Sequence, residues 1–137
     1  MTSPTARTLQ LLRRLGYHAE PVERWLPGAR VRKDLLGCID VLGLRPGSPV
    51  FGVQCTSDDH TAARLKKAVA LPQLRTWLAC GCAFEVWGWH RRGGRWQVRR
   101  VAVRGADLQP VDLTPRPRRQ KRQRSLFDGL VPRETDP

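Results

Sequence analysis

The chain has 137 residues, with 25 Lys or Arg against 12 Asp or Glu, a formal net charge of +13 and a pI near 11.3. This length accommodates one domain with a single modest core. The charge imbalance exceeds what solubility requires and favours a nucleic-acid partner. No apolar run approaches membrane-spanning length and no apolar segment follows the polar residues 1–4, so we expect neither a membrane partner nor a secretory signal.

The four cysteines indicate a reducing compartment. Cys38 and Cys55 lie in apolar runs and are expected to be small buried residues. Cys80 and Cys82 are one residue apart, closer than the C-x-x-C spacing typical of a zinc pair. We therefore expect a cytoplasmic protein without structural zinc.

The first elements in the chain are a helix and a strand. Ser3 and Pro4 predict a helix start, apolar residues then recur at helical spacing, and Gly16 predicts the stop. Residues 17–25 alternate loosely and predict a strand, in which Pro21 favours an edge position or a bend.

Two apolar runs follow on either side of a turn at residues 46–49. The first, 35–44, is interrupted by one acid, Asp40, and the second, 50–55, has Gln54 as its strongly polar member. Short apolar runs around a tight turn predict two buried neighbouring strands.

A helix is predicted next, beginning near His60, with Ser57, Asp58 and Asp59 as candidate caps. Pro72 must kink or restart it. Residues 83–89 and 96–103 predict two further strands, joined by a hairpin at Gly93 and Gly94.

These elements predict an α/β domain over residues 1–108, with a mixed central sheet flanked by helices. Periodicity is lost after about Leu108, and residues 115–124 contain six basic side chains and two prolines. Residues 109–137 are therefore expected to form a flexible basic tail.

Asp40 is the most informative residue for chemistry, because a lone carboxylate in an apolar strand is costly to desolvate. A metal, a hydrogen-bond network or exposure at an outward position would each compensate. If the two strands pair as a hairpin, Gln54 lies beside Asp40 and offers a carbonyl oxygen. Carboxylate and amide oxygens suit Mg²⁺ (or Mn²⁺), so both residues are candidate metal ligands and catalytic residues.

The segment from Ile39-Asp40 through Val53-Gln54-Cys55-Thr56 resembles the PD-(D/E)XK nuclease superfamily, over roughly residues 5–90. Asp40 matches the motif's Asp, and Gln54 matches the variant found in Mrr-like restriction endonucleases. The arrangement is also similar to archaeal-type Holliday junction resolvases. The resemblance implies a helix, three strands, a helix and a strand (an αβββαβ core), and Mg²⁺-dependent DNA cleavage. Because junction resolvases generally work as dimers, it also implies a homodimer.

The sequence departs from the motif at Thr56, where the family has its lysine. In some members the lysine migrates to the following helix, so Lys66 and Lys67 are candidate catalytic residues and Arg64 a candidate contact to DNA. The alternative is a solvated helix face, or phosphate contacts without chemistry.

Other acids supply further candidates. Glu23 and Asp34 are candidate additional metal ligands, or else surface ion-pair partners of nearby arginines. The trio Asp58, Asp59 and His60 has the composition of a metal cluster, but helix capping explains the two acids better.

Further candidate DNA contacts lie in the last predicted hairpin, on the strand after it and in the tail: Arg91, Arg92, Arg99, Arg100, Arg118, Arg119, Lys121 and Arg122. Trp89 is the preferred candidate for stacking on an unpaired base. Trp77 and one of Trp87 or Trp89 are expected in the core.

The tail ends in a second motif. Gln123, Leu126 and Phe127 resemble the Q-x-x-L-F peptide by which bacterial replication and repair proteins bind the sliding clamp. The alternative is that the apolar residues fold back onto the domain. The leading hypothesis is a metal-dependent DNA endonuclease, with branched DNA such as Holliday junctions as one candidate substrate. The alternatives are a non-catalytic nucleic-acid-binding module on the same fold and an RNA-associated basic protein.

Overall fold

A computed structural model describes residues 2–114 of the chain. The helices are α1 (Pro4–Arg14), α2 (Thr61–Val69) and α3 (Pro72–Ala79), with a 3-10 turn, η1 (Asp58–His60), before α2. The strands are β1 (His18–Pro21), β2 (Arg24–Leu26), β3 (Val31–Lys33), β4 (Val41–Leu44), β5 (Phe51–Ser57), β6 (Ala83–Arg92), β7 (Arg95–Arg104) and β8 (Gln109–Asp112). None of the described helices combines the length and the apolar character needed to cross a bilayer.

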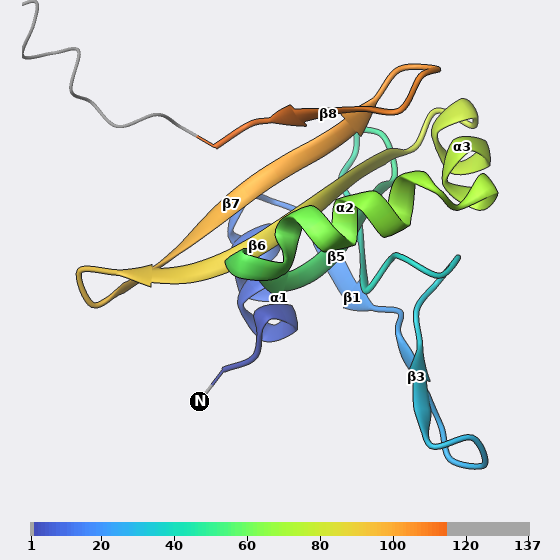
Figure 1. Cartoon of the computed structure of the whole chain (residues 1–137). Helices are drawn as coiled ribbons and strands as arrows, with labels where there is room; N and C mark the ends of the chain where they lie inside the picture. The colour runs from blue at the N-terminus through green and yellow to red at the C-terminus, as the bar shows by residue number, and fades with distance from the viewer. Residues whose placement is uncertain (1, 115–137) are drawn as a thin grey trace, which may run out of the picture.

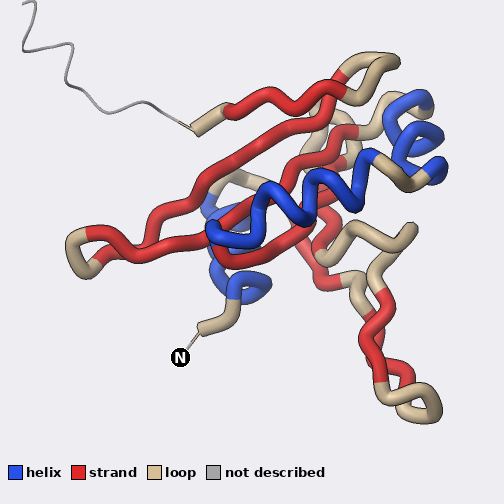
Figure 2. Tube along the Cα trace, viewed as in Figure 1, coloured by secondary structure: helices blue, strands red, loops and turns tan. Residues whose placement is uncertain are grey.

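Six strands form one mixed sheet in the order β1-β4-β5-β6-β7-β8 (Figures 1 and 2). β5 and β6 pair in parallel, and α2 and α3 form the crossover between them; all other neighbours in the sheet are antiparallel. The predicted α/β class with a mixed central sheet is therefore confirmed.

Helices cover both faces of this sheet. Along β6, Phe84 and Val86 belong to the core cluster beneath α2 and α3, whereas Trp87 and Trp89 belong to the cluster beneath α1. Successive side chains of a strand point to opposite faces, so the two clusters are separate apolar layers.

Local signals set several element boundaries as predicted. The Ser3 side chain caps α1 by accepting a hydrogen bond from the Ala6 N–H at 3.1 Å, and Gly16 follows the helix with a φ of +94°. Pro72 starts α3 as a separate helix. Gly93 and Gly94, with φ of +60° and +77°, form the two-residue turn between β6 and β7.

Two predicted strands differ from the structure. Residues 17–25 form no single strand: β1 ends at Pro21, and the chain leaves the sheet as a separate hairpin of β2 and β3, which projects from the body (Figure 1). Within residues 35–44 only Val41–Leu44 is a strand. The preceding residues turn back, with Gly37 at a φ of +81°, and are apolar because Cys38 and Ile39 enter the core.

β8 was not expected, since it begins beyond Leu108, the predicted end of the folded domain. It pairs with β7 from Val101–Asp112 to Arg104–Gln109, and its four residues are all exposed. A strand held at a sheet edge by backbone hydrogen bonds needs no apolar periodicity.

Candidate functional site

Three carboxylates converge at the root of the projecting hairpin. Glu23 directly precedes β2, Asp34 directly follows β3, and Asp40 directly precedes β4. One carboxylate oxygen from each lies within 4.8 Å of the others. The β2–β3 hairpin, called the arm below (residues 24–33), thus carries two of the three acids at its base.

A local irregularity in strand pairing positions Asp40. Its N–H donates to the Val53 carbonyl at 2.9 Å, although Val53 is also the partner of Val41, so two residues oppose one as in a β-bulge. The Asp40 carboxylate then accepts a hydrogen bond from the Cys55 N–H at 2.8 Å. Asp40 is only 6% exposed, so its predicted burial is confirmed, although it lies just before the strand and not within it.

The environment of Asp40 favours its neutral form. Burial is the main cause that raises the pKa of Asp40 to about 8. The Cys55 N–H opposes this shift, whereas a hydrogen bond with Asp34 and the negative charges of Asp34 and Glu23 raise the pKa further. At neutral pH the cluster therefore retains a proton unless a cation takes its place.

The donor set fits a hard divalent cation. Carboxylate oxygens are the ligands that Mg²⁺ and Mn²⁺ prefer, and one cation would relieve the mutual repulsion of the three acids. Glu23 also accepts a hydrogen bond from Arg32 of the arm at 2.6 Å, which offsets part of its charge. Glu23, Asp34 and Asp40 are thus three of the four predicted ligands.

The fourth predicted ligand, Gln54, is placed differently. It is 3% exposed, and because Val53 and Cys55 face the α1 cluster, its side chain points to the α2–α3 face of the sheet. Within residues 2–114, no hydrogen bond joins the Gln54 amide to Asp40. Gln54 as a metal ligand and catalytic residue stays a prediction.

The cations of α2 do not contact the acids. Lys66 and Lys67 are exposed, Arg64 is half-buried, and none of them forms an ion pair or side-chain hydrogen bond with another described residue. Thr56, at the position of the motif lysine, is buried. Arg32 is the basic side chain that reaches the cluster, so the catalytic roles of Lys66 and Lys67 stay predictions.

The four predicted DNA contacts of β6 and β7 divide into two kinds. Arg100 donates to both Glu85 oxygens at 2.8 and 3.0 Å, and Arg99 lies 3.3 Å from Asp112 and 3.8 Å from Asp58. Arg91 and Arg92 are exposed at the hairpin tip.

Two interpretations of individual residues were wrong. Trp89 is 7% exposed and donates to the Thr8 hydroxyl at 2.9 Å, so it belongs to the core together with Trp87 and is not open to a base. No side-chain cap begins η1 or α2. Asp58 instead faces His90, 3.4 Å away, and Asp59 accepts a hydrogen bond from Ser57.

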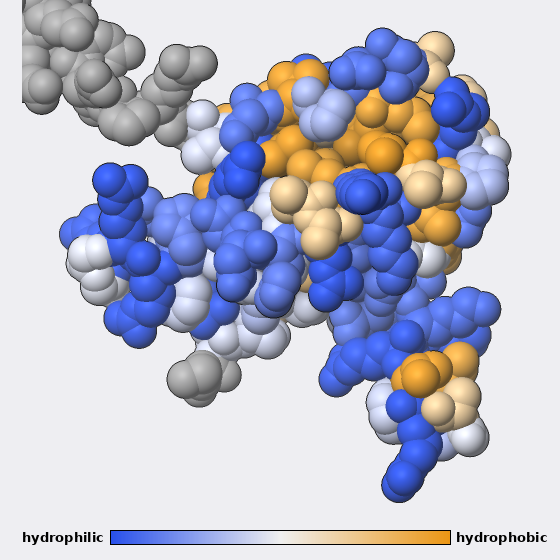
Figure 3. Space-filling view, in the orientation of Figure 1, coloured by the Kyte–Doolittle hydropathy of each residue, from blue (hydrophilic) through white to orange (hydrophobic). Residues whose placement is uncertain are grey.

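Sequence reasoning missed the arm as a basic element. Its ten residues include four basic side chains and no acid, and all except Leu26 are exposed. The basic residues are Arg24, Arg30, Arg32 and Lys33. Figure 3 shows hydrophilic surface over the β6–β7 hairpin and much of the arm. Pro27-Gly28 between two short segments was the signal for a hairpin.

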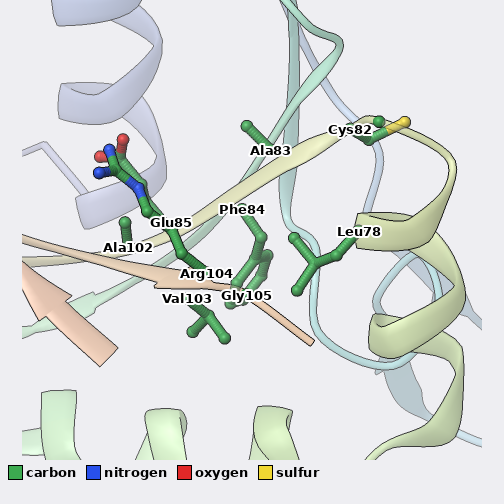
Figure 4. Close-up of a pocket in the computed structure, with 10 residues that line it drawn as sticks. Leu78, Cys82, Ala83, Phe84, Glu85, Ala102, Val103, Arg104 and Gly105 are labelled. Atoms are coloured by element: carbon green, nitrogen blue, oxygen red, sulfur yellow. The ribbon is translucent and has the colours of Figure 1, made fainter. Parts of the chain in front are cut away.

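An apolar hollow lies elsewhere, between α3 and the ends of β6 and β7 (Figure 4). It measures about 270 Å³ and is lined by Leu78, Phe84 and Val103 among others. The acid on its wall, Glu85, is already bound by Arg100 and by the Trp87 indole N–H at 2.7 Å. The carboxylate on this wall is therefore already paired, and the other polar side chains that line the hollow are those of Cys82 and Arg104.

The tail residues Arg118, Arg119, Lys121, Arg122, Gln123, Leu126 and Phe127 lie outside the described residues. Comparisons with protein-family models, with curated proteins and with solved structures found no match to this chain.

Proposed function

We propose that this protein is a divalent-metal-dependent nuclease that cleaves DNA at the carboxylate cluster. The observation that carries the proposal is the convergence of Glu23, Asp34 and Asp40, with Asp40 buried, in a chain of net charge +13. Clustered carboxylates repel a polyanion even in a strongly basic protein, and a cation bound between them would remove that local repulsion.

The order of elements supports the proposal. Without the arm, the chain runs α1, β1, β4, β5, then α2 and α3, then β6, with β1-β4-β5 antiparallel and β5 parallel to β6. This order is compatible with the helix, three strands, helix and strand implied by the resemblance of the Asp40 and Gln54 segments to the PD-(D/E)XK superfamily. On this proposal the arm would be an insertion between the first two core strands.

The reaction is hydrolysis of a phosphodiester. A water oxygen forms a bond to phosphorus, the bond from phosphorus to one sugar oxygen breaks, and the leaving oxygen takes up a proton. A bound Mg²⁺ or Mn²⁺ would lower the pKa of water and stabilise charge on the phosphate. Glu23, Asp34 and Asp40 would hold the ion, the Cys55 N–H orients the Asp40 carboxylate, and Arg32 restrains Glu23.

A cleavage assay on the full chain tests this function. End-labelled duplex, four-way junction and single-stranded DNA, with RNA equivalents, are incubated with Mg²⁺, Mn²⁺ or EDTA. Asp40→Asn should reduce the metal-dependent rate at least about 100-fold, because a neutral amide binds a divalent cation poorly, while affinity for DNA changes little. Asp107→Asn, in the β7–β8 loop, is the matched control and should cleave normally. Equal rates for wild type and Asp40→Asn would exclude this site.

One observation favours the alternative, a non-catalytic nucleic-acid-binding module. Thr56 is a buried hydroxyl where the motif has its lysine, and a hydroxyl does not supply a positive charge to activate water. Lys66→Ala and Lys67→Ala separate the two functions. If either residue has taken over the lysine role, its variant should lose single-turnover rate far more than affinity; a phosphate contact should lose affinity and salt dependence only.

A further inference from the structure

Two guanidinium groups meet at one indole ring, where α1 faces the tip of the β6–β7 hairpin. The Cζ of Arg7, in the first turns of α1, lies 3.3 Å from the centre of the Trp96 ring, and that of Arg91 lies 5.5 Å from it. Arg91 and Trp96 are direct cross-strand partners. The Trp96 residue is still 43% exposed, so the site opens to solvent.

Arg7 has no anionic partner in the described part of the chain. It is 7% exposed, its Nε is buried without a hydrogen-bond partner, and its guanidinium forms no ion pair within residues 2–114. Burial, followed by the charge of Arg91, lowers the pKa of Arg7. The single side-chain hydrogen bond of Arg91 runs to the Gly94 carbonyl at 3.2 Å.

Two half-buried arginines of β7 are paired with acids, Arg100 with Glu85 and Arg99 with Asp112. The half-buried Arg64 of α2 forms no ion pair with another described residue, but Arg7 is more deeply buried than any of these. Contact with an aromatic face offsets only part of the cost of burying a cation. The buried Nε–H of Arg7 thus has no acceptor among the described residues and lies beside a second cation, and an anion that bridges the two guanidinium groups would satisfy both.

The site is linked to the carboxylate cluster through the packing of α1. Thr8, the neighbour of Arg7, accepts the Trp89 indole hydrogen bond, and Cys55 packs in the same apolar cluster as Leu12 of α1. The N–H of that same Cys55 binds the Asp40 carboxylate.

We propose that Arg7 and Arg91, braced on Trp96, bind one backbone phosphate of a nucleic-acid strand. The inference rests on the proposed function for the identity of the ligand, and adds a second anchor point on the strand. A strand held there is fixed relative to the three carboxylates by the rigid first turns of α1, which lie between the sites.

Binding without metal tests the anchor separately from cleavage. The full chain carrying Asp40→Asn is titrated in EDTA with labelled duplex and single-stranded DNA across a range of salt. Arg7→Gln and Arg91→Gln should each weaken binding about 10-fold, because a charge-assisted hydrogen bond is lost. The two effects should not be additive, since both side chains bind the same phosphate. Arg104→Gln, at the opposite end of β7 and without an ion pair among the described residues, is the matched control and should combine additively with either.

A structural role for Arg7 has a different signature. Sulfate, used as a probe ion, should raise the melting temperature of the wild type and of Arg7→Lys, but not of Arg7→Gln. If Arg7→Gln binds DNA with wild-type affinity, and its effect simply adds to that of Arg91→Gln, the proposed phosphate anchor is wrong. Arg7 would then be a packing residue, whether or not the variant is less stable. Failure of the nuclease proposal looks different: DNA binds through Arg7 and Arg91 but is not cut with any metal. A wild type that binds no nucleic acid would overturn both.

Discussion

Asp40 is the residue whose ionisation should dominate the pH dependence of stability. Its folded pKa of about 8 lies above the ordinary value of 3.8, so the folded state binds more protons between these two pH values. Without metal, the contribution of Asp40 to the free energy of unfolding therefore falls as pH rises from about 4 to 8, by up to about 1.4 kcal/mol per pH unit. Above about pH 8 this contribution is constant. Urea unfolding in EDTA should show Asp40→Asn gaining stability relative to wild type as pH rises, because the amide removes the buried charge. A stability difference between Asp40→Asn and wild type that shrinks as pH rises would contradict this prediction. The same pH trend in the control Asp107→Asn would also contradict it.

A bound divalent cation should offset the loss of stability that ionisation of Asp40 causes. We expect Mn²⁺ to bind the ionised carboxylates, so it should raise the melting temperature at pH 8 and do so less at pH 6, where protons compete. At 100 times its Kd an ion adds about 2.7 kcal/mol. Glu23→Gln, Asp34→Asn and Asp40→Asn should each lose most of this effect, measured by thermal unfolding. Glu20→Gln, an exposed acid on β1, should keep it; loss of the effect in that control would indicate non-specific binding.

At the scale of elements, the arm is the feature to test. Arg30 and Lys33 are exposed and form no ion pair among the described residues, so their charges are available to phosphates. A two-stranded β-ribbon also fits the major groove of duplex DNA. Arg30→Gln with Lys33→Gln should reduce the salt dependence of duplex binding by about two released counterions, with the urea midpoint unchanged. If affinity and salt slope stay at wild-type values, the arm does not contact DNA and serves only to carry Glu23 and Asp34.

At the scale of the whole molecule, the charge is spread over the domain and the tail. Six of the basic residues fall within 115–124, so a chain ending at Thr114 should bind DNA more weakly and with a flatter salt dependence. The loss can reach about five released counterions on B-DNA and should be similar for all sequences, because phosphate contacts carry no base readout. Cleavage per bound molecule should be retained, since the three carboxylates lie before residue 41. An unchanged salt slope would show that the tail does not touch DNA.

The sequence by itself determined what depends on residues close together in the chain. Ser3, Pro4 and Gly16 bound α1 because caps and left-handed stops act within one turn of helix. Gly93 and Gly94 define the β6–β7 hairpin because a two-residue turn depends on the backbone conformation of its own two residues. The burial of Asp40 followed from its apolar neighbours, whereas its role as a metal ligand stays a prediction.

Only the tertiary structure decided which distant residues meet. Strand pairing brings the carboxylates of Glu23, Asp34 and Asp40 together. A bulge at Asp40 directs its carboxylate to the Cys55 N–H. Strand alternation places the Gln54 side chain on the opposite face of the sheet. The contact of Arg7 with Trp96 joins residues from opposite ends of the domain's sequence. Periodicity and turn chemistry act over a few residues, whereas register and crossover connections are set by the packing of both faces of the sheet at once, so no local pattern encodes these contacts.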